Sequence, residues 1–149
     1  MNNSEVKLFT DGACKGNPGP GGWGVIMIQA DGSTNEMFGG EVFTTNNRME
    51  LLAVIKGLEA IQGIENINIY TDSKYVKNGI TLWIKNWEKN GWKTASKKDV
   101  ANQDLWLSLI RLVENKSIKW NWVKGHSGNQ GNERADLLAN RGVASCSQK

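Results

Sequence analysis

Four acidic side chains lie where predicted strands end or within predicted helices. Asp11 and Asp72 each follow a predicted strand, while Glu50 opens one predicted helix and Asp136 lies in the last one. Strands that end side by side would bring such carboxylates together, and their mutual repulsion would then require a cation. Hard divalent ions such as Mg²⁺ prefer oxygen ligands, and two of them about 3.5–4 Å apart clamp an in-line phosphoryl displacement. The four residues are therefore candidate metal ligands for phosphoryl chemistry.

Asp11 and Glu50 also have purely structural interpretations. Asp11 precedes Gly12, and this pair is common in turns. Glu50 lies three residues after Asn47, which is the spacing of a capping box. Glu50 nevertheless shares a helical face with small and apolar residues, so it should point partly inward, where a carboxylate needs a partner. Both interpretations stay open at this point.

The other two acids have structural alternatives as well. Asp72 precedes Ser73 and a predicted short helix, so it could serve only as a helix N-cap. Asp136 could be a solvated helical residue, or it could form an ion pair with Arg134 or Lys124. The spacing of the residues does not decide between these roles and metal binding.

The chain has one histidine, His126, which lies in the polar, glycine-flanked stretch KGHSGNQGNERAD. A lone histidine is most often structural, but a polar loop is not a packed core. Because histidine exchanges protons near neutral pH, His126 is a candidate for proton transfer. The structural and the catalytic roles both remain possible.

Positive charge is concentrated in one tryptophan-containing segment, residues 74–98. It holds seven lysines and one acid, Glu88, which gives a charge of +6, whereas the whole chain carries +3. Trp83 and Trp87 are four residues apart, and packing on one helical face explains them. Packing does not explain the lysines, whose repulsion a polyanion would relieve.

Composition and motifs exclude several other classes. The glycine-rich stretch GACKGNPGPGG lacks the spacing of a phosphate-binding loop and leads into a strand, which argues against a nucleotide cofactor. Cys14 and Cys146 form neither a disulfide framework nor a metal pair, and one histidine excludes a histidine-rich zinc site. No apolar run approaches the length of a membrane span, so we expect a cytoplasmic protein without a membrane partner.

Hydrophobic periodicity predicts an α/β fold in one domain, residues 1–149, with a mixed sheet covered by helices. The predicted strands are Glu5–Thr10, Trp23–Gln29, Asn35–Phe43, Asn66–Thr71 and Ile118–Val123. The predicted helices are Asn46–Ile61, Ser73–Asn78, Ile80–Asn90, Asp104–Glu114 and Asn132–Val143. Loops are expected at Gly12–Gly22, Trp92–Ala101 and Gly125–Gly131.

Five stretches of the chain closely resemble bacterial type 1 ribonuclease H. They are FTDGACKGNPGPGGWG, TTNNRMELLAVIKGLEA, IYTDSKYV, ITLWIKNWEKNGWKT and WNWVKGHSGNQGNERADLLA, which together cover nearly the whole chain. The resemblance implies the ribonuclease H-like fold, with a mixed five-stranded sheet flanked by helices. It also implies a monomeric endonuclease that hydrolyses the RNA strand of RNA/DNA hybrids with two Mg²⁺ ions, for which Mn²⁺ can substitute. Little sequence specificity and 3′-hydroxyl and 5′-phosphate ends are expected.

The same resemblance assigns roles to residues. It implies that Asp11, Glu50, Asp72 and Asp136 bind the metal ions, and that His126 assists proton transfer or product release. It further implies four sets of residues that contact the hybrid. The groove residues are Cys14, Asn17, Asn46 and Asn47, and the pocket for a DNA phosphate is formed by Thr45 and Asn102. Tyr75 and Trp83 line the DNA side, and the basic handle carries Lys85, Lys89, Lys93, Lys97 and Lys98.

Two alternatives come from other functional classes. A non-catalytic nucleic-acid-binding module would use the same basic segment but would not cut in the presence of Mg²⁺, and the complete set of carboxylates argues against it. An integrase-like DNA recombinase on the same fold would usually need further DNA-binding domains, which 149 residues do not accommodate.

Overall fold

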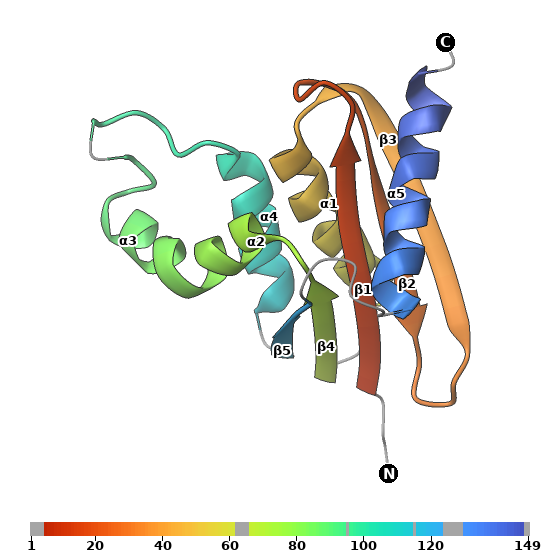
Figure 1. Ribbon diagram of the computed structural model, residues 1–149. Helices are drawn as coiled ribbons and strands as arrows, with labels where there is room; N and C mark the ends of the chain where they lie inside the picture. Colours follow the sequence, from red (N-terminus) through yellow and green to blue (C-terminus); the bar gives the residue numbers. More distant parts are fainter. Residues whose placement is uncertain (1–4, 62–65, 95, 115, 124–129, 148–149) are drawn as a thin grey trace.

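The computed structural model describes residues 5–61, 66–94, 96–114, 116–123 and 130–147. It contains a five-stranded sheet with the strand order β3-β2-β1-β4-β5, flanked by helices, which confirms the expected α/β class (Figure 1). The strands are β1 Glu5–Cys14, β2 Gly19–Ile28, β3 Thr34–Thr44, β4 Asn66–Thr71 and β5 Ser117–Trp122. The helical segments are α1 Asn46–Ala60, α2 Lys74–Asn78, η1 Gly79–Trp83, α3 Ile84–Lys89, α4 Gln103–Val113 and α5 Gln130–Ser147.

The antiparallel half of the sheet is longer than the sequence predicts. The glycine-rich stretch expected as a loop over Gly12–Gly22 is largely strand, because β1 continues to Cys14 and pairs with β2 from Gly21 onward. Close packing explains why glycines stand in these strands. A Cβ on Gly22 would lie 2.2 Å from a backbone oxygen of α5, so a larger residue would push that helix away.

The parallel half of the sheet brings the candidate site together. β1 pairs in parallel with β4, and β4 pairs in parallel with β5. Parallel neighbours end at the same edge of the sheet, so the segment that follows β4 lies beside the second half of β1. Asp11 in β1 and Asp72 after β4 therefore come from adjacent strands.

The main core lies between the sheet and the helix α1. Leu8 and Val25 of the sheet pack with Val54 and Leu58 of α1, and all four side chains are buried. The helix α4 packs against this layer through Trp106, which is fully buried. On the opposite face, α5 covers β1, β2 and β3 (Figure 1). Among the residues described, no helix is long and apolar enough to cross a membrane.

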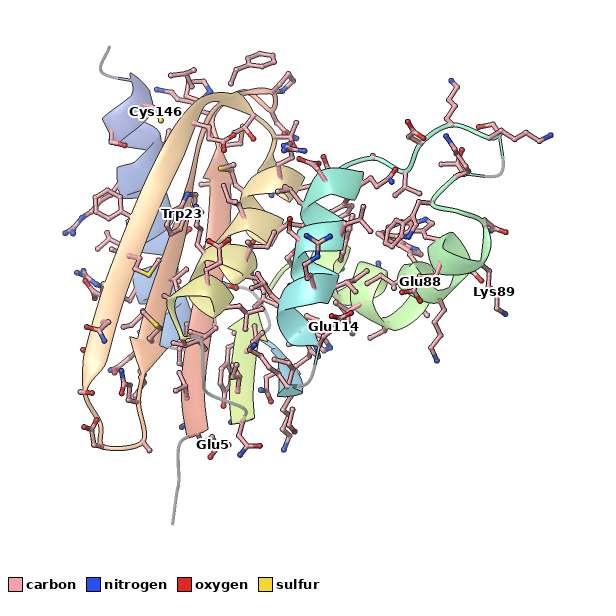
Figure 2. All side chains as sticks on the ribbon, turned by 180° about the vertical axis from the view of Figure 1, so that it is seen from behind. Glu5, Trp23, Glu88, Lys89, Glu114 and Cys146 are labelled. Atoms are coloured by element: carbon pink, nitrogen blue, oxygen red, sulfur yellow. The ribbon has the colours of Figure 1, made fainter. Side chains whose placement is uncertain are left out.

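A helical protrusion, residues 74–94, extends away from the sheet (Figure 1). The prediction that Gly79 ends the first short helix is confirmed, since α2 ends at Asn78 with Gly79 as its C-cap. The chain nevertheless stays helical at Gly79 and passes through the π-helical turn η1 directly into α3. The ring of Trp106 explains the glycine, since a Cβ on Gly79 would lie 2.0 Å from it. Glu88 and Lys89 lie on the part of the protrusion far from the sheet (Figure 2).

Candidate active site

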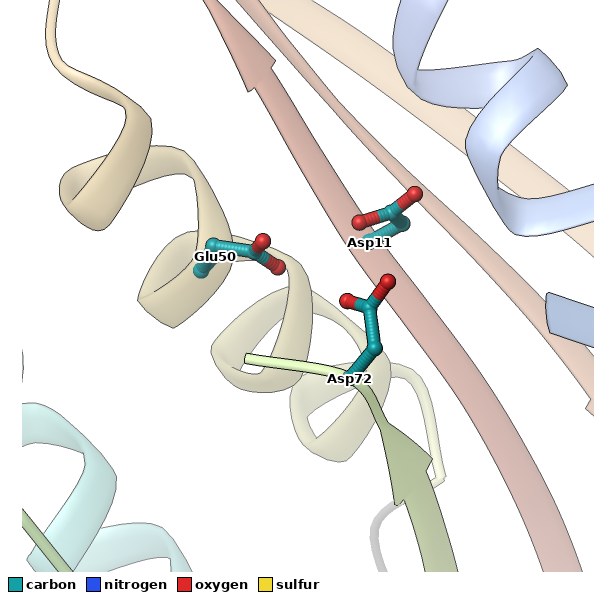
Figure 3. A group of neighbouring side chains, drawn as sticks. All are labelled: Asp11, Glu50 and Asp72. Atoms are coloured by element: carbon teal, nitrogen blue, oxygen red, sulfur yellow. The ribbon is translucent and has the colours of Figure 1, made fainter. Parts of the chain in front are cut away.

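Three carboxylates point toward one another from β1, from α1 and from the segment that follows β4 (Figure 3). One oxygen from each of Asp11, Glu50 and Asp72 can be chosen so that all three lie within 4.8 Å of one another. Asp11 and Glu50 are buried, and Asp72 is half-buried. The predicted convergence of these three acids is therefore present, and the spacing is one that a divalent cation can bridge.

The helix-capping interpretations of Glu50 and Asp72 are wrong. The N-cap of α1 is Thr45, whose hydroxyl accepts a hydrogen bond from the Arg48 N–H at 3.2 Å, so Glu50 is not part of a capping box. The N-cap of α2 is Ser73, whose hydroxyl accepts from the Val76 N–H at 3.1 Å, so Asp72 is not the cap. Glu50 and Asp72 each contribute an oxygen to the carboxylate cluster.

Burial and mutual repulsion make the cluster electrostatically unfavourable when no cation is bound. Burial, followed by repulsion from Asp72 and interaction with Asp136, raises the pKa of Asp11 to about 8. Burial and repulsion from Asp11 and Asp72 also raise the pKa of Glu50 well above its usual range. Among the residues that the structure describes, one carboxylate oxygen of Glu50, Oε1, is buried and has no hydrogen-bond partner. These features fit a site built for a divalent cation, which would hold the carboxylates in their ionised form.

Asp136 approaches the same cluster from α5. A hydrogen bond between its side chain and that of Asp11 contributes to the raised pKa of Asp11. Its predicted ion-pair partner Arg134 instead pairs with Glu36 of β3, so that alternative is wrong. The other predicted partner, Lys124, lies outside the described residues, as does His126.

The predicted groove residues gather around the start of α1. The Asn17 side-chain oxygen accepts a hydrogen bond from the Asn46 N–H at 2.8 Å, which ties the β1–β2 turn to the helix. The Cys14 thiol donates to the Thr44 carbonyl at 3.4 Å. Asn47 is exposed in the first turn of α1, and Thr45, predicted for the phosphate pocket, caps that helix. These residues therefore lie at the start of the helix that carries Glu50.

The predicted phosphate-pocket and DNA-side residues meet on the protrusion side of α1. The Asn102 amide nitrogen donates to the Tyr75 hydroxyl at 3.0 Å, and the Tyr75 ring contacts the Trp83 ring edge-on at 5.7 Å. Sequence reasoning did not single out Arg48, which donates to the Asn102 side-chain oxygen at 3.2 Å. The sequence does hint at Arg48, because this residue directly follows the predicted contact residues Asn46 and Asn47 and lies two residues before Glu50.

The five lysines of the predicted handle are all exposed: Lys85, Lys89, Lys93, Lys97 and Lys98. Lys93 is paired with Asp99 across a short bridge in the loop that follows α3. The tryptophans serve packing, as one interpretation predicted. Trp87 contacts Trp83, Trp92 and Trp106 with ring centroids 5.5–5.7 Å apart, and so anchors the lysine-bearing surface to α4.

Comparison with known proteins agrees with this geometry. A family model described as RNase H matches residues 3–144. A Cupriavidus metallidurans protein named Ribonuclease H is 59% identical over 141 residues, which are 95% of this chain and 97% of that protein. A Francisella philomiragia protein of the same name is 56% identical over 146 residues, 98% of this chain and 95% of that protein.

Solved structures show the same fold. The structure of LC9-RNase H1, described as a type 1 RNase H with the type 2 active-site motif, aligns with a TM-score of 0.85 at 32% identity and covers 97% of this chain and 74% of that chain. The N-terminal RNase H domain of a Mycobacterium tuberculosis protein aligns with a TM-score of 0.76 at 28% identity and covers 98% of both chains. With a family match over most of its length and relatives this similar, the chain belongs to the bacterial ribonuclease H family and is a ribonuclease H enzyme.

Proposed function

We propose that this ribonuclease H is an endonuclease that hydrolyses the RNA strand of RNA/DNA hybrids. The observation that carries the proposal is the cluster of Asp11, Glu50 and Asp72, each of which offers one oxygen within 4.8 Å of the others. Such a cluster suits metal-assisted hydrolysis of a phosphodiester, and the exposed lysines of the handle suit a polyanionic substrate. The names of the relatives point to the same activity.

The metal ions we propose are two Mg²⁺, held by Asp11, Glu50, Asp72 and Asp136, with Mn²⁺ able to replace them. When bound, these ions would stabilise charge on the phosphate and lower the pKa of a water molecule. The protein supplies the four carboxylates from four parts of the fold: β1, α1, the segment after β4, and α5. The buried oxygen of Glu50, which has no hydrogen-bond partner in the described part of the chain, is a suitable ligand atom.

Hydrolysis also requires an attacking water molecule and the transfer of a proton, for which His126 is the candidate. Water attacks phosphorus, the bond to the 3′ oxygen of the RNA breaks, and the products carry a 3′-hydroxyl and a 5′-phosphate. We propose that His126 receives or delivers a proton in this sequence, or assists release of the product. Histidine suits that task because its pKa lies near neutral pH.

Recognition of the hybrid would rest on shape and charge. A roughly A-form hybrid has a wide, shallow minor groove that displays the 2′-hydroxyls of the RNA strand. We propose that the short polar residues Cys14, Asn17, Asn46 and Asn47 contact this groove. Thr45, Asn102, Tyr75 and Trp83 would contact the DNA strand, with the lysines of the handle on its phosphates. Phosphate contacts position a duplex without reading its sequence, so we expect little sequence specificity.

We further propose that residues 1–149 form one domain and that the enzyme acts as a monomer in the cytoplasm. No second copy is needed to complete the site, because all four proposed ligands come from one chain. Analytical ultracentrifugation of the purified chain, with and without hybrid, tests the monomer.

The activity is tested with end-labelled RNA/DNA hybrid, RNA duplex and DNA duplex, each in Mg²⁺, Mn²⁺ or EDTA. We expect cleavage of the RNA strand of the hybrid alone, in either metal but not in EDTA, and extension of the products by a polymerase would verify the 3′-hydroxyl. Asp11→Asn should abolish cleavage, while Asp31→Asn, the same change in an exposed turn, should not. Cleavage in EDTA, or equal cutting of DNA duplex, would overturn the proposal.

A further inference from the structure

A bidentate ion pair joins the first turn of α1 to the first turn of α4. Arg48 donates from Nη1 to Asp104 Oδ1 at 3.1 Å and from Nη2 to Asp104 Oδ2 at 2.9 Å. Two parallel bonds of this kind fix the plane of the guanidinium as well as its position. Arg48 is about one-third exposed, whereas the Asp104 side chain is 65% exposed. The acid therefore lies on the open side of the pair.

The same guanidinium holds the side chain of Asn102. Nη1 of Arg48 also donates to Asn102 Oδ1 at 3.2 Å, so the carbonyl end of that amide faces the arginine. The amide nitrogen of Asn102 must then point the other way, and it donates to the Tyr75 hydroxyl at 3.0 Å. Asn102 adopts a left-handed backbone conformation, with φ 60° and ψ 28°, which asparagine accepts more readily than most other residues.

This arrangement determines what Tyr75 can offer to a substrate. Its hydroxyl oxygen accepts hydrogen bonds from Asn102 Nδ2 and from Trp106 Nε1, both at 3.0 Å. A hydroxyl group has two lone pairs and one hydrogen. With both lone pairs engaged, the hydrogen is the group left to contact an oxygen of a ligand, such as one on a phosphate.

We propose that Asp104 is a positioning residue for hybrid binding, acting through Arg48 to fix the orientation of Asn102 and Tyr75. The inference rests on the proposed function, since it assumes that Asn102 and Tyr75 touch the DNA strand. Asp104 itself does not contact the substrate in this scheme. Its own negative charge opposes a polyanion, so its contribution must come through the geometry that it imposes.

Because the negative charge of Asp104 repels a polyanion, Asp104→Asn distinguishes a positioning role from a purely electrostatic one. If Asp104 acted only as a surface charge, its removal would strengthen binding of the polyanionic hybrid. If it positions Arg48, removal should weaken binding, with KM rising about three- to tenfold and kcat staying within about twofold. Asp104→Ala, which also loses the acceptor oxygen, should raise KM further. Equilibrium binding of fluorescent hybrid in EDTA should show the same order of affinities without catalysis.

The matched control is Glu59→Gln at the other end of α1. Glu59 is exposed and pairs with Lys56, so this variant changes the net charge by the same amount without touching Arg48. Its separation from Arg48 along the helix, about 16 Å, exceeds the screening length at physiological salt. We expect its KM to be equal to or slightly below that of the wild type.

Arg48→Lys provides a second variant that keeps the positive charge. A lysine cannot form the two parallel bonds and the bond to Asn102 together, so its KM should also rise. Wild-type or lower KM in both Asp104→Asn and Arg48→Lys would overturn the positioning role, even though hybrid cleavage persisted. Loss of the proposed function would look different, because the wild type itself would then fail to cut the hybrid. Circular dichroism of each variant verifies that it is folded.

Discussion

The backbone of Gly12 lies directly against that of Glu50. A Cβ on Gly12 would be 2.5 Å from the Glu50 nitrogen and 2.6 Å from the Met49 carbonyl carbon, which is closer than packed atoms can approach. The first turns of α1 can therefore reach β1 only because residue 12 has no side chain. This contact places Glu50 beside Asp11, whose carboxylate accepts a hydrogen bond from the Gly12 N–H at 2.9 Å.

Gly12→Ala should push α1 away from β1 and separate the carboxylates. We expect hybrid cleavage to fall by more than about tenfold and the free energy of unfolding to fall by about 1–3 kcal/mol, as is typical of overpacking. Steady-state cleavage and urea unfolding of the same preparation measure both effects. Gly32→Ala is the control, since open space surrounds Gly32 and its φ of +89° predicts a loss of stability without a loss of activity.

Asp11→Asn should stabilise the metal-free protein at high pH. The pKa of Asp11 is raised from its usual 3.8 to about 8 in the folded chain, so between these values the folded state keeps a proton that the unfolded state has released. The contribution of Asp11 to stability is therefore most favourable below about pH 4 and is lost as the pH rises towards 8. Above pH 8 the variant should be more stable than the wild type by at least about 1.4 kcal/mol, the equivalent of one pKa unit.

Thermal or urea unfolding in EDTA from pH 4 to pH 9 measures this difference, which should vanish near pH 4. Asp31→Asn is a control that should change the stability in the opposite direction, because hydrogen bonds from Ser33 lower the pKa of Asp31. That variant should be slightly less stable than the wild type at neutral pH. Parallel pH profiles for wild type and Asp11→Asn would contradict the electrostatic description of the cluster.

The local pattern predicted most of the fold and marked the four carboxylates as candidate metal ligands, but it did not decide between that role and a structural one. The alternation of apolar residues identified β4, and the resemblance to ribonuclease H assigned Asp11 and Asp72 to one site. What the sequence could not show depends on contacts between distant residues. The ring of Trp106 packs so closely on Gly79 that no Cβ fits there, and nothing in the sequence around either residue indicates this contact. Arg48 was missed for the same reason, because its partner lies 56 residues away.

The charge of the handle should control the salt dependence of hybrid binding. Each phosphate contact that is lost should make the slope of log affinity against log salt shallower by up to about 0.9. KM should rise more than kcat falls, because these contacts are present in the ground state and the transition state alike. The variant to compare with the wild type replaces four lysines by alanine: Lys89, Lys93, Lys97 and Lys98.

A matched variant replaces four lysines outside the handle, and its slope should stay close to that of the wild type: Lys7, Lys56, Lys116 and Lys119. Within the handle, Lys93→Ala should change the slope less than Lys89→Ala, because Lys93 is already paired with Asp99. Equal slopes for the wild type and the handle variant would show that these lysines do not contact the hybrid.

His126→Ala should separate a catalytic role from a structural one. General acid–base assistance is typically worth about 10²–10⁴-fold, so we expect kcat to fall strongly while activity stays measurable. KM and metal affinity should change little, because His126 is not a proposed ligand of the metal or of the groove. A structural histidine would instead lower the thermal midpoint and leave kcat per folded molecule intact. Measuring both quantities on one preparation distinguishes the two, and a lowered midpoint with wild-type kcat would refute the catalytic role.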